Sequence, residues 1–172
     1  MSKIIVVYYS GFGHTKKIAE RIAKGAGGEA ISVEHMNWEK LEDADAIIFG
    51  SPTYMGNVAA PFKKFMDDSS KIWLGQKWKN KIAGGFTNSS SPSGDMLNTL
   101  QTIMIFAMQH SMIYVGTGLA KDNNGINRIG SYSGTMAQSE NAPPEVTPPE
   151  SDLMTAELYG KRIAEITARF KK

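Results

Sequence analysis

Short apolar runs alternate along the chain with longer stretches in which apolar residues recur at helical spacing. The first run, KIIVVYYS at 3–10, is built from β-branched and aromatic residues and is typical of a strand buried on both faces. The stretch that follows is helical, with charged residues outside and an apolar face formed by Ile18, Ala19, Ile22, Ala23 and Ala26. The pattern therefore predicts a buried strand followed at once by an amphipathic helix.

The same alternation continues to the end of the chain. Further strands are expected over 30–36, 43–54 (stopped by Pro52), 81–89 and 112–116, and further helices over 61–70, 94–110 and 153–170. Strands that alternate with helices predict a parallel sheet covered on both faces, and five strands on this length favour the flavodoxin-like order 2-1-3-4-5. We therefore expect an α/β three-layer sandwich, with residues 1–172 forming one domain.

Residues 116–150 do not follow this pattern. They hold five glycines, four prolines and four asparagines. Structureless loops longer than about 12–15 residues are uncommon in compact domains and are generally functional or disordered. The segment could serve as a partner surface, cover a pocket or join subunits, and the sequence leaves these alternatives open.

The stretch SGFGHT at 10–15 joins the first strand to its helix. In an open α/β sheet, ligands bind beyond the carboxyl ends of the strands where the strand order reverses, which places this turn at the expected site. Gly11 and Gly13 permit a sharp turn, while Ser10 and Thr15 add hydroxyls to the unpaired amides of the helix start. These features predict a phosphate site, the alternative being an ordinary strand-to-helix turn.

The kind of phosphate site can be narrowed by the motifs that are missing. The fingerprint GxGxxG fails because Lys16 stands in place of its third glycine, and GxxxxGK[ST] does not occur anywhere in the chain. The turn therefore suits one terminal phosphate better than a pyrophosphate.

Two further strand ends complete the predicted site. GSPTYMGNVAAPF at 50–62 and TNSSSPSGD at 87–95 offer backbone amides, hydroxyls and apolar side chains without strong charge. Such groups suit a heteroaromatic ring with a polar edge. The alternative for the second stretch is a serine-rich turn in which Asp95 caps the next helix.

Composition excludes several other functions. The chain has no cysteine, and the spacing of His14, His35 and His110 is not that of a metal site, so neither thiol chemistry nor a bound metal is expected. The net charge of +2 is spread along the chain, which argues against a nucleic-acid partner. No apolar run approaches the ~18 residues of a membrane span, and none resembles a signal peptide, so we expect a cytoplasmic protein without a membrane partner.

Several stretches together resemble a known family. They are YYSGFGHT (8–15), DADAIIFGSPTYMGN (43–57), FMDDSSKIW (65–73), the serine loop (87–95) and QHSMIYVG (109–116). On these the chain is similar to the flavodoxin-like WrbA-type NAD(P)H:quinone oxidoreductases and related NADPH-dependent FMN reductases. The resemblance implies FMN as cofactor, NADH or NADPH as donor, a quinone or similar flat acceptor, and a homo-oligomer, either dimer or tetramer.

The resemblance also implies roles for individual residues. It gives His110 a catalytic role at the polar edge of the flavin, although a cation favoured by the end of its helix is the alternative. Phe12 and Trp73 would wall the substrate pocket, Trp73 across a subunit contact. The implied cofactor-binding residues are Ser10, Gly11, Phe12, Gly13, His14, Thr15, Pro52, Thr53, Tyr54, Met55, Gly56, Asn57, Asn88, Ser89, Ser90, Ser91, Pro92, Ser93, Gly94 and His110.

Some features depart from the family, and two other functions stay open. The segment between the second and third strands is short, TNSSSPSGD replaces a glycine-rich loop, and Met55 replaces an aromatic residue. A flavodoxin-type electron carrier is one alternative, although such carriers usually have strongly acidic surfaces and this chain does not. A non-catalytic interaction protein is the other.

Overall fold

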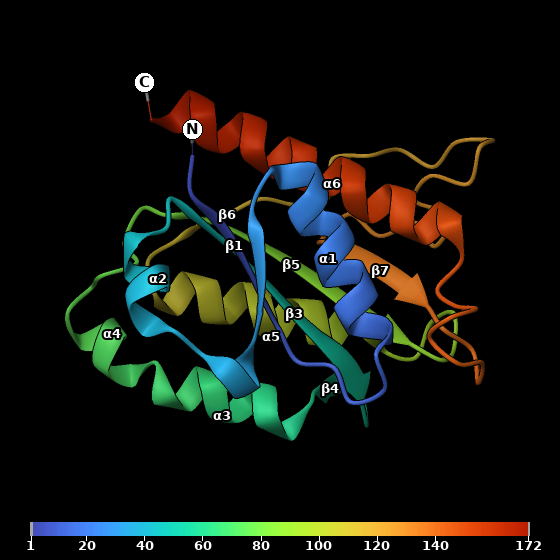
Figure 1. Ribbon diagram of the computed structural model, residues 1–172, viewed down its shortest axis with the longest axis horizontal. Helices are drawn as coiled ribbons and strands as arrows, with labels where there is room; N and C mark the ends of the chain where they lie inside the picture. Colours follow the sequence, from blue (N-terminus) through green and yellow to red (C-terminus); the bar gives the residue numbers. More distant parts are fainter. Residues whose placement is uncertain (1, 172) are drawn as a thin grey trace.

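The computed structural model describes residues 2–171 and shows a parallel sheet between two layers of helices (Figure 1). Neighbouring strands pair in parallel in the order β2-β1-β3-β5-β6. The five strands are β2 (Glu29–Ser32), β1 (Ile4–Tyr8), β3 (Ala46–Tyr54), β5 (Ile82–Ser89) and β6 (Ile113–Tyr114). The predicted fold and strand order 2-1-3-4-5 are therefore confirmed.

The helices cover the two faces of the sheet in separate sets. One face packs against α1 (His14–Ala26) and α6 (Glu150–Phe170). The other packs against α2 (Trp38–Asp43), α3 (Ala60–Asp68), α4 (Ser70–Leu74) and α5 (Met96–Gln109). Strand β1 serves both cores, because Ile4 and Val6 face the first set while Ile5 and Val7 face the second. This is why its sequence is apolar throughout rather than alternating.

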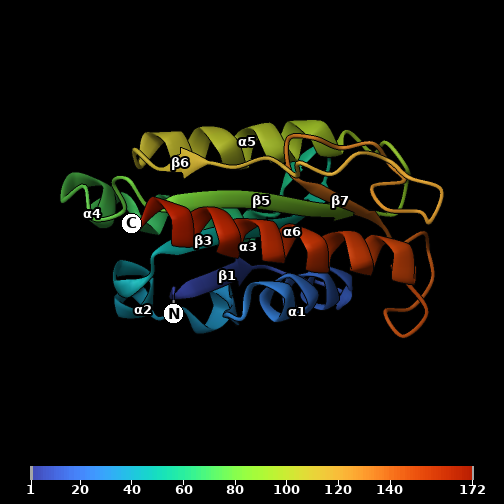
Figure 2. The same ribbon diagram turned by 90° about the horizontal axis from the view of Figure 1, so that it is seen from above.

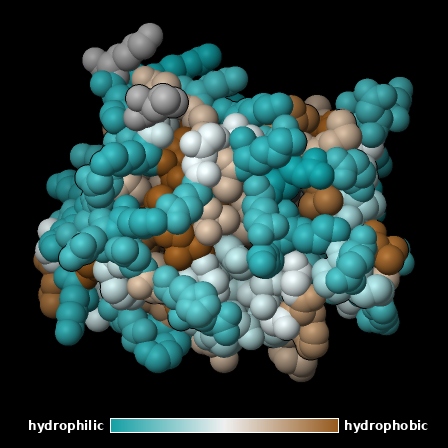
Figure 3. Space-filling model, viewed as in Figure 1, coloured by the Kyte–Doolittle hydropathy of each residue, from teal (hydrophilic) through white to brown (hydrophobic). Residues whose placement is uncertain are grey.

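The amphipathic helices turn their polar faces outward, which makes the surface largely hydrophilic. The face shown in Figure 3 is mostly hydrophilic, and its hydrophobic areas are small and separate. Within residues 2–171, no helix is both long enough and apolar enough to cross a membrane.

Three predicted boundaries are corrected. The second strand ends at Ser32, whose hydroxyl accepts a hydrogen bond from Glu34 N and opens the 3-10 turn η1 (Val33–His35). The third strand begins at Ala46 rather than at 43, and Pro52 does not stop it, since the strand runs to Tyr54 and its end pairs with β4 (Asn57–Val58). The last helix begins at Glu150, three residues earlier than its apolar pattern indicated.

The fifth position of the sheet is occupied by two short strands. Strand β6 pairs with the start of β5, whereas β7 (Thr135–Gln138) pairs with its end, from Phe86 to Ser89. Figure 2 shows β6 and β7 beside opposite ends of β5. The glycine- and proline-rich segment therefore returns to the sheet and delivers the residues after β7 to its carboxyl edge.

A tyrosine bridges the break between these two strands. The hydroxyl of Tyr159, on α6, accepts a hydrogen bond from Gly85 N (3.1 Å) and donates one to Val115 O (2.6 Å). Burial raises the pKa of this hydroxyl, so it remains protonated. The Tyr159 hydroxyl thus provides a hydrogen-bond partner for Gly85 N and Val115 O between the segments of β5 that pair with β6 and with β7.

Candidate functional site

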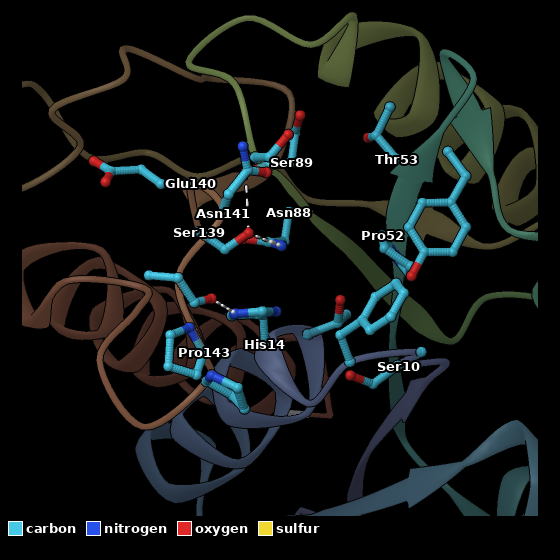
Figure 4. A pocket seen from close by; sticks show the side chains of 17 residues that line it. Ser10, His14, Pro52, Thr53, Asn88, Ser89, Ser139, Glu140, Asn141 and Pro143 are labelled. Atoms are coloured by element: carbon cyan, nitrogen blue, oxygen red, sulfur yellow. Dashed lines mark hydrogen bonds between the residues drawn. The ribbon is translucent and has the colours of Figure 1, made fainter.

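A cavity of about 630 Å³ lies at the carboxyl edge of the sheet, where the segments after β1, β3, β5 and β7 meet (Figure 4). Its volume is within the range of about 300–1,000 Å³ typical of small-molecule sites. It is lined by Ser10, Gly11, Phe12, His14, Thr15, Pro52, Thr53, Tyr54, Asn88, Ser89, Ser90, Ser139, Glu140, Asn141, Ala142, Pro143 and Pro144. The structure thus brings together parts of all three predicted loops.

The Ser10–Thr15 turn forms the polar end of the cavity. Ser10 Oγ accepts hydrogen bonds from Gly13 N and Lys16 N, both at 3.1 Å, and so fixes the turn against the start of α1. Gly13 has φ 93°, a left-handed conformation that favours glycine. The amides of His14 and Thr15 lie in the first turn of α1, where no helical acceptor is available. Within residues 2–171 the hydroxyl of Thr15 forms no hydrogen bond, which leaves it available to a ligand.

This end of the cavity is suited to an anion. A hydrogen bond to a charged group contributes about 1.5–3 kcal/mol, whereas the helix dipole contributes about 0.3–1 kcal/mol. Two or three amides and a hydroxyl therefore outweigh the dipole as the source of affinity.

Two aromatic side chains, Phe12 of the turn itself and Tyr54, form a wall that adjoins the turn. Phe12 and Tyr54 meet edge to face, with ring centroids 6.4 Å apart, and Phe12 is 74% exposed. A Cβ on Gly11 would stand 2.6 Å from the Tyr54 hydroxyl, so the glycine leaves room for Tyr54 to pack over the turn. Thr53, which precedes Tyr54, is held by hydrogen bonds of 2.8 Å to the hydroxyls of Thr87 and Thr99. This wall presents aromatic rings to the cavity on a fixed backbone.

Asn88 supplies a further polar group to the cavity lining. Its Nδ2 donates to Ser139 Oγ at 3.0 Å. Its Oδ1 is buried and has no hydrogen-bond partner within residues 2–171. Buried polar atoms are nearly always paired, so this oxygen is a candidate acceptor for a ligand N–H or O–H.

The sequence interpretation missed the wall that follows β7. Residues Ser139–Pro144 line the cavity, and His14 Nε2 donates a hydrogen bond of 2.8 Å to the Ala142 carbonyl (Figure 4). The only signal for this wall was the unusual length and composition of 116–150. The observed placement supports the alternative in which part of that segment covers a pocket.

Some predicted residues lie beside the cavity rather than in its lining. Gly13 determines the conformation of the turn through its left-handed backbone but is not part of the lining. Met55 is fully exposed at the tip of the β3–β4 hairpin, next to Gly56, and Asn57 bonds to Thr102 Oγ1. The other predicted residues of the serine loop are not part of the cavity lining, namely Ser91, Pro92, Ser93 and Gly94.

His110, which was expected to reach the bound cofactor, does not line the cavity of its own chain. Helix α5 starts at the carboxyl edge of the sheet and rises about 1.5 Å per residue, so its 14 residues place His110 roughly 20 Å away at the other edge. There His110 Nε2 donates to Ser69 Oγ (2.9 Å), since that hydroxyl donates to Met66 O. Burial lowers the pKa of His110 from 6.5 to about 4.

Trp73 is also absent from this cavity. It lines a separate hollow of about 480 Å³ together with Ser69, Phe106 and His110. Trp73 is partly exposed there, with 42% of its surface accessible. Neither Trp73 nor His110 can touch a ligand bound at the Ser10–Thr15 turn of the same chain.

Comparison with known proteins relates this arrangement to a family. Residues 34–126 match the family model described as NADPH-dependent FMN reductase. Flavodoxin FldP of Pseudomonas aeruginosa is 40% identical over 96% of this chain and 97% of its own length. An NAD(P)H dehydrogenase (quinone) of Archaeoglobus fulgidus is 30% identical over 98% of this chain and 99% of its own. The solved structure of a flavodoxin, WrbA-like protein from Agrobacterium tumefaciens is 42% identical, covers 98% of this chain and 99% of its own, and superposes with a TM-score of 0.81.

Proposed function

The chain belongs to the NADPH-dependent FMN reductase family, and we propose that it binds FMN in the cavity and transfers electrons from NADH or NADPH to a quinone or similar flat acceptor. One observation carries this proposal. A turn suited to a single phosphate and an exposed aromatic wall beside it line one cavity of about 630 Å³.

The residues present fit each part of FMN. The phosphate would bind the amides of the Ser10–Thr15 turn and the Thr15 hydroxyl. The ring would lie against Thr53 and Tyr54, and the unpaired Asn88 Oδ1 would accept a hydrogen bond from the cofactor. Ser89 and Ser90 would contact its other side, as proposed for the serine loop.

The protein contributes binding and orientation to the reaction. When bound, FMN supplies two-electron chemistry between the nicotinamide and the acceptor. Thr53 holds the aromatic wall in place through its bonds to Thr87 and Thr99, and Phe12 offers an exposed ring to a flat substrate. Trp73 would reach a substrate only at the cavity of another copy, which is why we retain a homo-dimer or tetramer in the proposal.

A flavodoxin-type electron carrier is the second candidate. It is favoured by the 40% identity to a protein named flavodoxin FldP. The net charge of +2 and the exposed Phe12 favour an enzyme that admits a small flat molecule over a carrier with a one-signed docking surface.

Steady-state turnover separates the two candidates. The protein would be loaded with FMN, freed of excess cofactor and mixed with NADPH or NADH, with and without benzoquinone. The enzyme proposal predicts nicotinamide oxidation at 340 nm that depends on benzoquinone and persists over many turnovers. Retained FMN without turnover would support the carrier instead. Failure to retain FMN would refute both.

A further inference from the structure

The segment Ser139–Pro149, here named the proline strap, crosses the phosphate end of the cavity and is fixed at both ends. Ser139 N donates to Ser89 O (2.9 Å), which ties the strap to the end of β5. Thr147 Oγ1 donates back to Ser139 O (2.7 Å), closing the segment on itself. Directly after the strap, Glu150 forms a two-point ion pair with Arg21 at 2.7 and 3.0 Å. The strap is thus a fixed wall.

Two side chains of α1 fix the middle of the strap. His14 Nε2 donates to the Ala142 carbonyl at 2.8 Å, and Lys17 Nζ donates to the Pro144 carbonyl. The two residues are three positions apart and therefore share one face of the helix. Pro144 Cγ lies 3.1 Å from where a Cβ of Gly13 would stand, so the strap rests directly on the Ser10–Thr15 turn. Figure 4 shows His14 and Pro143 together on the side of the cavity opposite Pro52 and Thr53.

We propose that His14 and Lys17 determine cofactor specificity by holding the strap where it admits a flavin that ends in one phosphate and excludes one extended by a second phosphate and a nucleoside. This inference rests on the proposed FMN site. A group that continued past a phosphate on the turn would meet the volume filled by Ala142–Pro144. Pro143 and Pro144 also lack backbone N–H groups, so this part of the wall offers a second phosphate no amide donor.

The test compares FMN with FAD by isothermal titration calorimetry on protein freed of bound flavin. The variants are the double substitution His14→Ala with Lys17→Ala, the conservative His14→Gln, and Lys24→Ala as matched control. Lys24 is a cation on the same helix that pairs with Glu157 and does not touch the strap. Circular dichroism checks that all variants are folded.

The proposal predicts that the wild-type protein prefers FMN over FAD, and that the double variant reduces this preference by roughly tenfold or more through tighter FAD binding. His14→Gln, which keeps a donor, and Lys24→Ala should retain the wild-type preference. An unchanged FMN-to-FAD ratio in the double variant, or equal weakening of both flavins, would overturn the proposal while leaving the FMN site intact. Wild-type protein that binds neither flavin would refute the proposed function itself.

Discussion

His110 should make the stability of the fold fall steeply in mild acid. The residue is 3% exposed, and its ring packs against Trp78 and Phe106, with ring centroids 4.3 and 4.9 Å away. Nε2 donates to Ser69, while Nδ1 is buried without a partner within residues 2–171. Protonation would place a cation in this apolar cluster with a new N–H that has no acceptor. Lys63 and Asp67, which line the neighbouring hollow, already pair with each other.

The magnitude follows from the pKa. Burial lowers the pKa of His110 from 6.5 to about 4. Between these two pH values His110 is protonated in the unfolded chain and neutral in the folded chain. The free energy of unfolding therefore falls as the pH drops below 6.5, until the pKa of the folded state is reached. One pKa unit corresponds to about 1.36 kcal/mol, so the full loss is about 3 kcal/mol, and about 2.5 kcal/mol is lost at pH 4.5.

Urea denaturation followed by circular dichroism at pH 7.5 and pH 4.5 measures this loss. Carboxylates contribute to both proteins, so the difference between wild type and His110→Gln isolates the histidine. We expect the wild type to lose about 2–3 kcal/mol more than His110→Gln, whereas the exposed His35→Gln should behave as wild type. Parallel losses in wild type and His110→Gln, or an NMR titration of His110 near pH 6.5, would refute the reasoning.

Four further substitutions test the fold and the cavity. Tyr159→Phe should cost about 1–3 kcal/mol in urea denaturation because Gly85 N and Val115 O lose their buried partner; a loss within experimental error would show that the bridge is dispensable. Gly11→Ala should weaken FMN binding, measured by quenching of flavin fluorescence, by roughly tenfold because its Cβ meets the Tyr54 hydroxyl at 2.6 Å. Adding Tyr54→Phe removes the clashing atom and should restore much of that affinity, and no restoration would place the cause elsewhere. Asn88→Ala removes the unpaired acceptor and should weaken FMN roughly tenfold in the same assay, so unchanged affinity would exclude Asn88 Oδ1 from the contact.

The parts of the structure that local pattern determines could be predicted from the sequence. The apolar run before Ser10 identified a central strand, and the glycines and hydroxyls of the following turn identified the polar end of the cavity. Both depend on contacts between residues close in the chain, or on burial on two faces, and these leave a periodic signal.

The parts of the structure that depend on contacts between residues distant in the chain could not be predicted from the sequence. Strand β7 has four residues and gains its place from pairing with β5, and the proline strap gains its place from His14 and Lys17 more than 120 positions earlier. His110 is a different case. Its position at the far edge follows from the length and direction of α5, which a resemblance between short sequence motifs does not show.

The comparison of FMN with riboflavin by equilibrium dialysis tests the central claim most directly, because the two ligands differ only in the phosphate. Hydrogen bonds to a charged group at the Ser10–Thr15 turn predict that FMN binds at least ~100-fold more tightly than riboflavin. Ser10→Ala combined with Thr15→Ala removes one hydroxyl donor and the bonds that fix the turn and should reduce this difference by roughly tenfold or more, and Ser111→Ala, at the other edge of the sheet, should preserve it. Equal affinity for FMN and riboflavin in the wild-type protein would contradict the assignment of this turn as the phosphate site.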